Sequence, residues 1–223
     1  MRFLKVLSAA ALLATVATGA VADGGGYGRS VREFEVTVTN LTAGVVFTPL
    51  LVATHSGRIS MFKPGQPASD GLGILAEGGD TAPLQAALGN SSEVLDAVST
   101  SGLLAAGASV TVKVRGSSRF DRLSVAGMLL PTNDGFAGLN SAELPWDRAS
   151  VTLTLSGYDA GTEPNDELCA NIPGPQCGGS GVSAGVAEGF VHVHSGIHGV
   201  GDLSAARYDW RNPVAQVTIR RVR

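Results

Sequence analysis

The feature that most constrains the fold is the alternation of apolar and polar residues in short segments separated by turn residues. Residues 32–39 (Arg-Glu-Phe-Glu-Val-Thr-Val-Thr) have the two-residue period of a half-buried strand. The same period recurs in 109–115 and 151–155, whereas 122–130 is a more continuous apolar run. Further strands are expected at 47–54, 191–194 and 214–220. Because Pro49 interrupts the first of these, we expect that strand to be bulged or to lie at an edge.

Seven or more short strands with turns between them predict an all-β domain, an antiparallel β-sandwich. Thirty glycines in 223 residues, above the usual share of about 7%, agree with many turns. Residues 69–99 have a different texture, with short helices expected at 83–88 and 92–98. Asn90 and Glu93 would form a capping box for the second. The predicted fold is therefore a β-sandwich with short helices in an insertion.

The N-terminus has the order of a cleavable export signal. Arg2 and Lys5 precede an apolar stretch at 6–16, and Ala20-Val21-Ala22 supplies the small residues of a cleavage site. The apolar stretch is too short to span a bilayer, which takes about 20 residues. We expect a signal peptide at 1–22, a flexible leader at 23–32 and one domain at 33–223. The mature chain is then secreted or periplasmic, without a membrane span.

The charge of the mature chain argues against two classes of partner. Beyond Ala22 there are 14 basic and 19 acidic residues, a formal net charge of −5. A mildly acidic chain without basic clusters has no electrostatic footprint for nucleic acid. For the same reason it has none for anionic membranes.

The only two cysteines, Cys169 and Cys177, lie in a long segment rich in Gly, Pro, Asn, Asp and Ser at 159–189. Outside the cytoplasm a disulfide is the default for such a pair, whereas a metal–thiolate site needs more ligands at tighter spacing. A structureless loop of this length is uncommon unless it is functional or restrained. We expect the disulfide to restrain it.

Acidic residues follow two of the expected strands. Asp134 lies in the turn after the run ending at Leu130, and Asp159 and Glu163 follow the strand ending at Leu155. If both strands leave the sheet at the same end, the three carboxylates converge, and a hard cation with oxygen ligands relieves their repulsion. The spacing does not fit an EF-hand. Spacing alone leaves solvated turn acids as an equal alternative.

Four segments in order carry a resemblance to a family. They are Val-Thr-Val-Thr-Asn-Leu-Thr at 36–42, Leu-Ser-Val-Ala-Gly-Met-Leu-Leu-Pro-Thr-Asn-Asp at 123–134, Tyr-Asp-Ala-Gly-Thr-Glu at 158–163 and Asn-Pro-Val-Ala-Gln-Val-Thr-Ile at 212–219. Together they resemble a spondin domain in its short bacterial form. The resemblance implies a β-sandwich that binds Ca²⁺ beside one end of its sheets. By resemblance the metal-binding acids are Asp134, Asp159 and Glu163.

Two departures from the animal members limit what carries over. The third acid is Glu163 where those members have Asp, which makes the expected site looser. The chain also lacks thrombospondin-type repeats and a reeler-like region, so adhesion to a matrix does not transfer directly. Asn133 and Asn165 are candidate accessory ligands.

A second group of residues is His192-Val193-His194-Ser195-Gly196-Ile197-His198. On a strand His192 and His194 point to the same face, and His198 could return after the turn. Such imidazoles could bind zinc or copper. The pattern favours a hydrogen-bonded strand face instead, because no cysteine or carboxylate stands at obvious ligand spacing. The other histidine, His55, is expected to be a strand-end residue.

Gly181-Val182-Ser183-Ala184-Gly185 matches the letters of a hydrolase nucleophile elbow. That elbow needs a buried strand before it and a helix after it, and neither is expected here. We therefore predict a secreted, non-enzymatic, calcium-binding module with a binding, adhesion or envelope-structural role and an extracellular or envelope partner, either protein or glycan. The alternative is an extracytoplasmic transition-metal protein or metalloenzyme using His192, His194 and His198.

Overall fold

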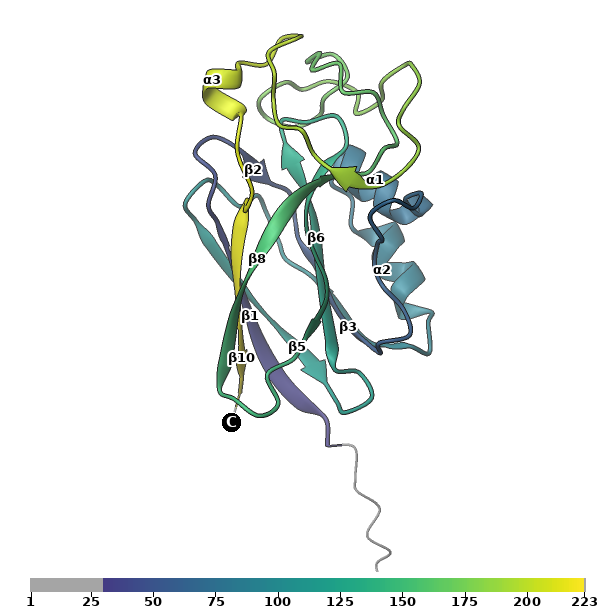
Figure 1. The fold of residues 1–223 in the computed structure, drawn as a ribbon, viewed down its shortest axis with the longest axis vertical. Coiled ribbons are helices and arrows are strands. Elements are labelled where there is room, and N and C mark those ends of the chain that lie inside the picture. Colours follow the sequence, from purple (N-terminus) through teal and green to yellow (C-terminus); the bar gives the residue numbers. More distant parts are fainter. Residues whose placement is uncertain (1–29, 223) are drawn as a thin grey trace, which may run out of the picture.

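A computed structural model describes residues 30–222 (Figure 1). The predicted signal peptide at 1–22 and most of the predicted leader lie outside the described residues. The strands are β1 (Arg32–Asn40), β2 (Val46–Phe47), β3 (Leu51–His55), β4 (Val94–Ser99), β5 (Ser109–Gly116), β6 (Arg122–Leu130), β7 (Gly135–Glu143), β8 (Ser150–Asp159), β9 (His192–Val193) and β10 (Ala215–Arg221). The helices are α1 (Asp70–Gly78), α2 (Ala82–Gly89) and α3 (Ala205–Tyr208).

The strands form one antiparallel, hydrogen-bonded path in the order β4-β3-β6-β7-β8-β10-β1-β5, with β2 added to β6 and β9 to β8. The two ends of this path lie side by side. Arg115 of β5 donates its N–H to Asp96 Oδ2 of β4 at 2.9 Å, and its carbonyl accepts from Thr54 Oγ1 of β3 at 2.6 Å. The sheet is therefore nearly closed and barrel-like. The mostly antiparallel β fold with a few short helices is confirmed, and the two-layer sandwich stays a prediction.

One expected helix is wrong. Residues 92–98 fall mainly in strand β4, which pairs with β3 from Leu51↔Ser99 to His55↔Val94. Asn90 is the C-cap of α2 and caps no following helix. Val94 and Val98 fit both the four-residue spacing of a helix and the two-residue spacing of a strand. Pairing with β3 decides between the two.

Helix α1 was not expected, although its ends are well marked. Ser69 Oγ accepts from the Leu72 N–H at 3.3 Å, which caps the N-terminus. Gly79 adopts a left-handed conformation (φ 73°) and donates to the Leu75 carbonyl, which ends the helix. Helix α2 agrees with the helix expected at 83–88.

The segment around Pro49 is bulged, as expected, but β3 is not an edge strand. Phe47 pairs with Leu129 and Leu51 with Ala126, so four steps along this segment match three along β6. The extra residue is a bulge, which places Pro49 where no ladder hydrogen bond is required. β3 itself lies between β4 and β6.

The apolar core lies on both faces of β3 and β6. Val52 and Val125 belong to the main cluster, while their neighbours Leu51 and Ala126 pack in a second cluster with the buried side of α1 and α2. Because the helices cover the outer face, both faces of these strands are apolar. This explains why 122–130 is a continuous apolar run rather than an alternating one.

The long segment after β8 covers one end of the sheet, at the top of Figure 1. Cys169 and Cys177 form the expected disulfide. Gly179 donates to the Ile172 carbonyl at 2.8 Å, and the Ile172 side chain is fully buried. The segment is thus fastened to the domain by covalent, hydrogen-bonding and apolar contacts.

Candidate functional site

Asp134 and Asp159 lie next to each other at the end of the sheet that this segment covers. Asp134 lies in the turn between β6 and β7, and Asp159 is the last residue of β8. Gly135 is the antiparallel partner of Asp159, and the Ala160 N–H donates to the Asp134 carbonyl at 3.1 Å. Both aspartates are fully buried. Two strands that were separate in the sequence therefore bring two carboxylates together.

The Asp134 carboxylate is only half satisfied. Its Oδ2 accepts from the Thr162 N–H at 2.7 Å, the Thr162 hydroxyl at 3.2 Å and the Glu163 N–H at 3.0 Å. Its Oδ1 is buried without a hydrogen-bond partner. A buried carboxylate oxygen in this condition is costly unless a proton or a cation meets it.

The Asp159 carboxylate is held by its own loop. Oδ1 accepts from the Gly161 N–H at 2.7 Å and Oδ2 from the Asn165 side-chain amide at 2.7 Å. Gly161 is required there, because it has a φ of 68° and an added Cβ would lie 2.3 Å from the Phe190 carbonyl oxygen. The close approach of residue 190 continues with Gly189, whose N–H donates to the Gly161 carbonyl at 2.9 Å.

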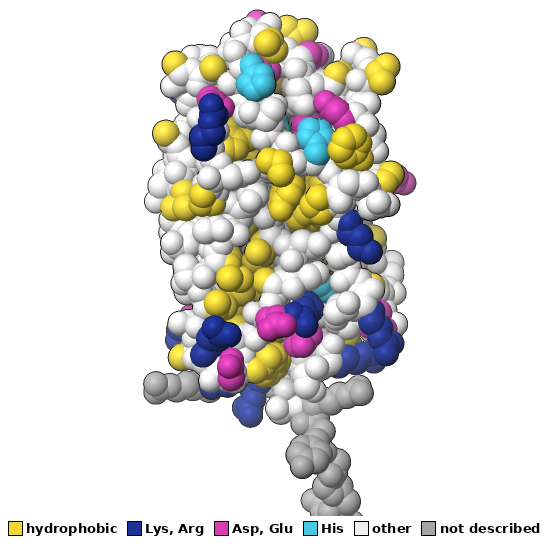
Figure 2. Space-filling model, in the orientation of Figure 1, with side chains coloured by type: hydrophobic (Ala, Val, Ile, Leu, Met, Phe, Trp, Pro, Cys, Tyr) yellow, Lys and Arg dark blue, Asp and Glu magenta, His cyan; other side chains and the backbone are white. Residues whose placement is uncertain are grey.

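No lysine or arginine among residues 30–222 forms an ion pair with Asp134 or Asp159. Burial, and then the charge of Asp159, raise the pKa of Asp134 to about 7, and burial raises the pKa of Asp159 as well. Within residues 30–222, the only basic side chain at ion-pair distance from either aspartate is His192, whose Nε2 lies 3.4 Å from Asp159 Oδ1 and pairs with it only when the ring is protonated. On the face shown in Figure 2, prominent histidine side chains lie at the loop-covered end, acidic side chains lie at both ends, and most lysines and arginines lie toward the opposite end.

Glu163 does not aim its carboxylate at the aspartate pair. Oε1 accepts from the Ser183 N–H at 2.8 Å and Oε2 from the Ser183 hydroxyl at 2.9 Å. Burial raises the pKa of Glu163. Of the three predicted ligands, the structure brings Asp134 and Asp159 together, whereas Glu163 contributes its backbone N–H. Its role as a ligand stays a prediction.

The candidate accessory ligand Asn133 forms hydrogen bonds to the loop segment. Its amide donates to Asp166 Oδ1 at 2.9 Å and to Ser183 Oγ at 2.8 Å, and its oxygen accepts from the Glu167 N–H at 3.2 Å. The Glu167 carboxylate in turn accepts three backbone N–H groups, those of His198, Gly199 and Val200, at 2.6–3.0 Å. These buried groups join distant parts of the loop segment. Their role was missed because sequence spacing does not reveal which backbone a side chain will reach.

The three clustered histidines have separate surroundings. His194 is buried against Trp210, and its Nδ1 accepts from the Gly196 N–H at 2.9 Å. Burial, with the charges of His192 and His198, lowers the pKa of His194 to about 4. His198 is exposed, with Nε2 3.1 Å from the Ser195 carbonyl oxygen. Only His192 turns toward carboxylates.

One compact set of ligating side chains stands out in the part of the chain that the structure describes. Asp159, Glu188 and His192 each offer an atom, and these atoms all lie within 4.8 Å of one another. Glu188 was missed by the sequence reasoning, which found no carboxylate at obvious spacing from the histidines. It precedes His192 by four residues, and Gly189 (φ 80°) lets the chain turn between them.

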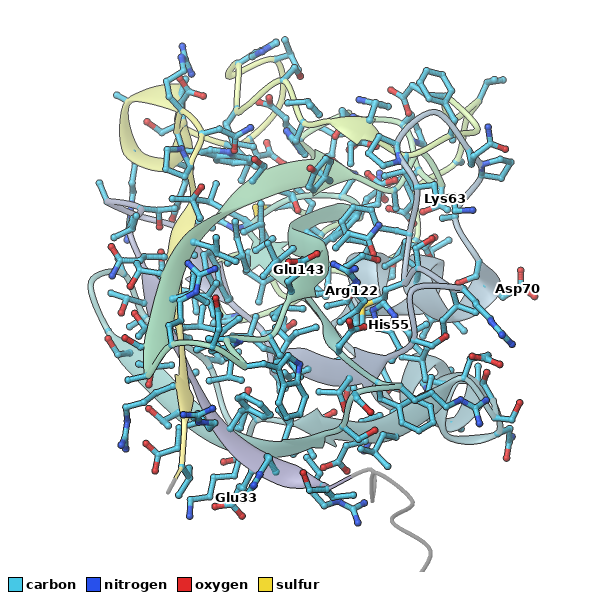
Figure 3. The ribbon with its side chains drawn as sticks, turned by 60° about the horizontal axis from the view of Figure 1, so that its bottom comes forward. Glu33, His55, Lys63, Asp70, Arg122 and Glu143 are labelled. Carbon is cyan, nitrogen blue, oxygen red and sulfur yellow. A yellow bond between two sulfur atoms is a disulfide. The ribbon has the colours of Figure 1, made fainter. Side chains whose placement is uncertain are left out.

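The remaining histidine, His55, ends β3 as expected and is buried. Its Nδ1 lies 2.9 Å from the Ser56 carbonyl oxygen and its Nε2 lies 2.8 Å from Ser124 Oγ. Figure 3 shows it near Arg122, which donates to Glu143 Oε1 at 2.6 Å. Burial lowers the pKa of His55.

Ser183 lies in a segment, 180–191, with neither strand nor helix. Its hydroxyl donates to Glu163 and accepts from Asn133. The strand–turn–helix of a nucleophile elbow is therefore not present around Ser183.

These observations define a mostly β domain with a buried acidic pair beneath a disulfide-fastened loop segment. Residues 38–167 match the Spondin_N family. The chain belongs to this family of spondin N-terminal domains, as the resemblance indicated. No curated protein matches the chain significantly.

Family membership and the disulfide together support an extracellular or secreted module. Among residues 30–222, the helices are all too short or too polar to cross a membrane. The matched range contains Asp134, Asp159 and Glu163 and stops before Glu188 and His192.

Proposed function

We propose that this domain is a non-enzymatic extracellular binding module that holds a calcium ion at Asp134 and Asp159. The observation that carries the proposal is the pairing of two fully buried carboxylates on adjacent strands without a lysine or arginine ion pair in the described chain. Ionised at neutral pH, such a pair needs a bound cation to offset its repulsion and desolvation.

The donor chemistry fits calcium. Asp134 Oδ1 is buried without a partner, and Ca²⁺ takes six to eight oxygen ligands in a flexible geometry. Asp134 and Asp159 would hold the ion, with carbonyls or waters completing the shell. Glu163 would join them only by exchanging its two bonds to Ser183 for the metal. The ion would supply the positive charge that the protein side chains lack.

The location of the pair suggests what the ion does. Asp134 belongs to the β6–β7 turn, while Asp159 begins the loop segment that covers this end of the sheet. Calcium bound to both would tie the segment to the sheet and stabilise the folded state by mass action. In this proposal the ion orders a surface that binds an extracellular protein or glycan, in an adhesive or envelope-structural role. The strands that carry this surface would be arranged as the two packed layers of a β-sandwich.

Thermal unfolding of chelator-treated protein tests the calcium site. We expect calcium to raise the melting temperature more than magnesium does, since magnesium demands a tighter octahedron. Asp159→Asn should remove most of the rise, and Glu163→Gln should have a smaller effect. Asp147→Asn, at a side chain that is 82% exposed, is the matched control and should respond like the wild type. Calorimetry that detects no calcium binding at millimolar concentration would refute the proposal.

A further inference from the structure

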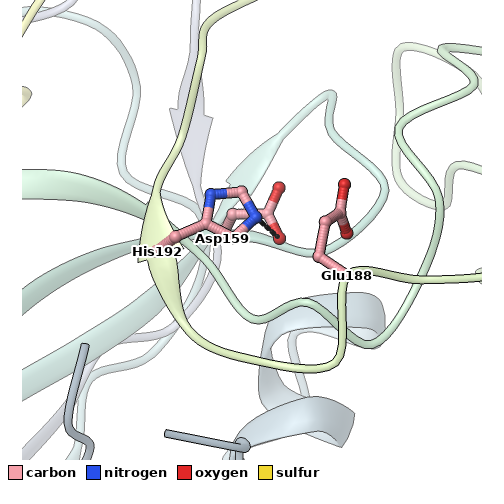
Figure 4. Close-up of side chains that lie close together, drawn as sticks. All are labelled: Asp159, Glu188 and His192. Atoms are coloured by element: carbon pink, nitrogen blue, oxygen red, sulfur yellow. Dashed lines mark ion pairs between the residues drawn. The ribbon is translucent and has the colours of Figure 1, made fainter. Parts of the chain in front are cut away.

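A second cluster of ligating groups lies where β9 meets the end of β8. Asp159 and His192 are direct antiparallel partners, so their side chains project from neighbouring positions of the two strands. Asp159 Oδ1 lies 3.4 Å from His192 Nε2, and a Glu188 carboxylate oxygen lies within 4.8 Å of both ligand atoms (Figure 4). Asp159 is buried, His192 is half-buried and Glu188 is exposed.

The orientation of the His192 ring determines which of its two nitrogens can bind a metal. Nδ1 lies 3.0 Å from the Val193 carbonyl oxygen. A carbonyl oxygen only accepts, so Nδ1 carries a hydrogen, and loss of the second ring proton leaves the lone pair at Nε2. Nε2 is buried and has no hydrogen-bond partner. A backbone carbonyl that holds the far nitrogen of an imidazole is a usual arrangement around metal-binding histidines.

His192 Nε2 and Asp159 Oδ1 face each other at 3.4 Å, and each binds a metal through an electron pair once its proton is lost. We propose that Asp159, Glu188 and His192 form a binding site for a divalent transition-metal ion of the zinc class. Two ligands of a tetrahedral zinc ion, each at about 2.0–2.1 Å, lie about 3.3–3.4 Å apart. The observed 3.4 Å between Asp159 Oδ1 and His192 Nε2 matches that edge, and Glu188 supplies a third, adjustable ligand.

The backbone around the site is well held. Val191 donates to the Gln66 carbonyl at 2.9 Å and accepts from the Gly65 N–H at 2.7 Å. Gly189 donates to Gly161, which fixes the start of the Glu188 turn. The Phe190 ring packs beside His192 with ring centres 5.3 Å apart. Three protein ligands with one of them exposed leave a fourth position open to water or to a group from a partner.

This site is chemically distinct from the proposed calcium site, although both use Asp159. Imidazole suits zinc, copper and nickel, whereas calcium takes oxygen ligands. Asp134 belongs to the calcium pair and not to the set of three. The two sites can therefore be separated by variants that leave Asp159 in place.

Isothermal titration of metal-free protein with Zn²⁺ in calcium-free buffer tests the inference. We expect one zinc per chain, and His192→Ala and Glu188→Gln should each weaken binding by at least about tenfold, since even changes to groups behind the ligands cost 10–100-fold. His198→Ala, at an exposed histidine outside the set, is the control and should bind zinc like the wild type. Co²⁺ should give the intense visible absorption of a four-coordinate site, absent in His192→Ala.

Asp134→Asn separates this inference from the proposed calcium site. It should retain zinc binding while losing the calcium-dependent rise in melting temperature, and His192→Ala should do the reverse. Metal-free melting temperatures show that each variant folds. The inference fails if wild-type protein binds no zinc at about 100 μM, or if His192→Ala binds zinc as tightly as the wild type. Loss of binding in His198→Ala alone would also overturn it.

Discussion

The residue that follows Asp134 is the antiparallel partner of Asp159, so two fully buried carboxylates meet at one end of β7 and β8. Asp134 Oδ2 accepts three hydrogen bonds, while Oδ1 has no partner. Because of this asymmetry, a charge-neutral replacement of Asp134 should raise the free energy of unfolding without metal and lower it with metal bound.

Asp134→Asn should raise the free energy of unfolding of metal-free protein at pH 8 by about 1–3 kcal/mol, within the range of single substitutions. The amide oxygen can accept from Thr162 and Glu163 as Oδ2 does, and the neutral side chain removes the repulsion by the Asp159 carboxylate. At saturating calcium the wild type should be more stable than the variant, because the variant has lost a ligand. Urea titrations with chelator and with calcium measure both differences. A variant less stable than the wild type under both conditions would contradict the prediction.

Ser183→Ala should weaken the loop segment without affecting any catalytic property. The change removes the donor to Glu163 Oε2 and the acceptor of the Asn133 amide, which should cost about 1–3 kcal/mol. Ser180→Ala, at an exposed serine in the same segment, is the control and should change stability by less than about 0.5 kcal/mol. Labelling of Ser183 by a serine-directed phosphonate would show that it is a nucleophile after all.

Replacing both cysteines by alanine should lower the free energy of unfolding by about 2–3 kcal/mol. Cys169 and Cys177 close a short loop, and the chain-entropy relation gives this amount for a sequence separation of eight residues. Chemical denaturation of the double variant against the oxidised wild type checks it. An unchanged midpoint and slope would mean that the other contacts of residues 159–189 restrain the loop by themselves.

Protonation of His55 in mild acid should lower the free energy of unfolding. Burial lowers the folded-state pKa of His55 below its ordinary value near 6.5, so the unfolded chain binds more protons in the interval between the two values. The contribution of neutral His55 to the free energy of unfolding is complete above pH 6.5 and is lost as the pH falls below it. The free energy of unfolding then changes by at most about 1.4 kcal/mol per pH unit.

His55→Gln removes this titration while keeping a polar side chain next to Ser124. The difference in unfolding free energy between wild type and variant should therefore shrink as the pH falls from 7 to 5. Denaturant titrations across that range measure it. A difference that stays constant with pH would contradict the prediction.

Local pattern was sufficient to predict a strand where one face of it is buried and the other is exposed to solvent. The alternation in 32–39 predicted β1, whereas the pattern left open whether the acids after Leu130 and Leu155 reach the same end of the sheet. Pattern failed for β7, whose residues 135–138 are buried on both sides and so do not alternate. It also failed at Val94 and Val98, whose spacing fits helix and strand equally.

By itself, the sequence determined the family, the mostly antiparallel β fold and the disulfide, because each depends on short-range pattern or on residue type. The placement of Asp134 and Asp159 at a common end depends on the pairing of β7 with β8. Only the tertiary structure decided where the carboxylates point. Glu163 turned to Ser183, and Glu188 and His192 joined Asp159, through cross-strand pairing and a glycine turn. Side-chain direction at a loop depends on contacts between segments distant in sequence, and residue spacing carries no information about them.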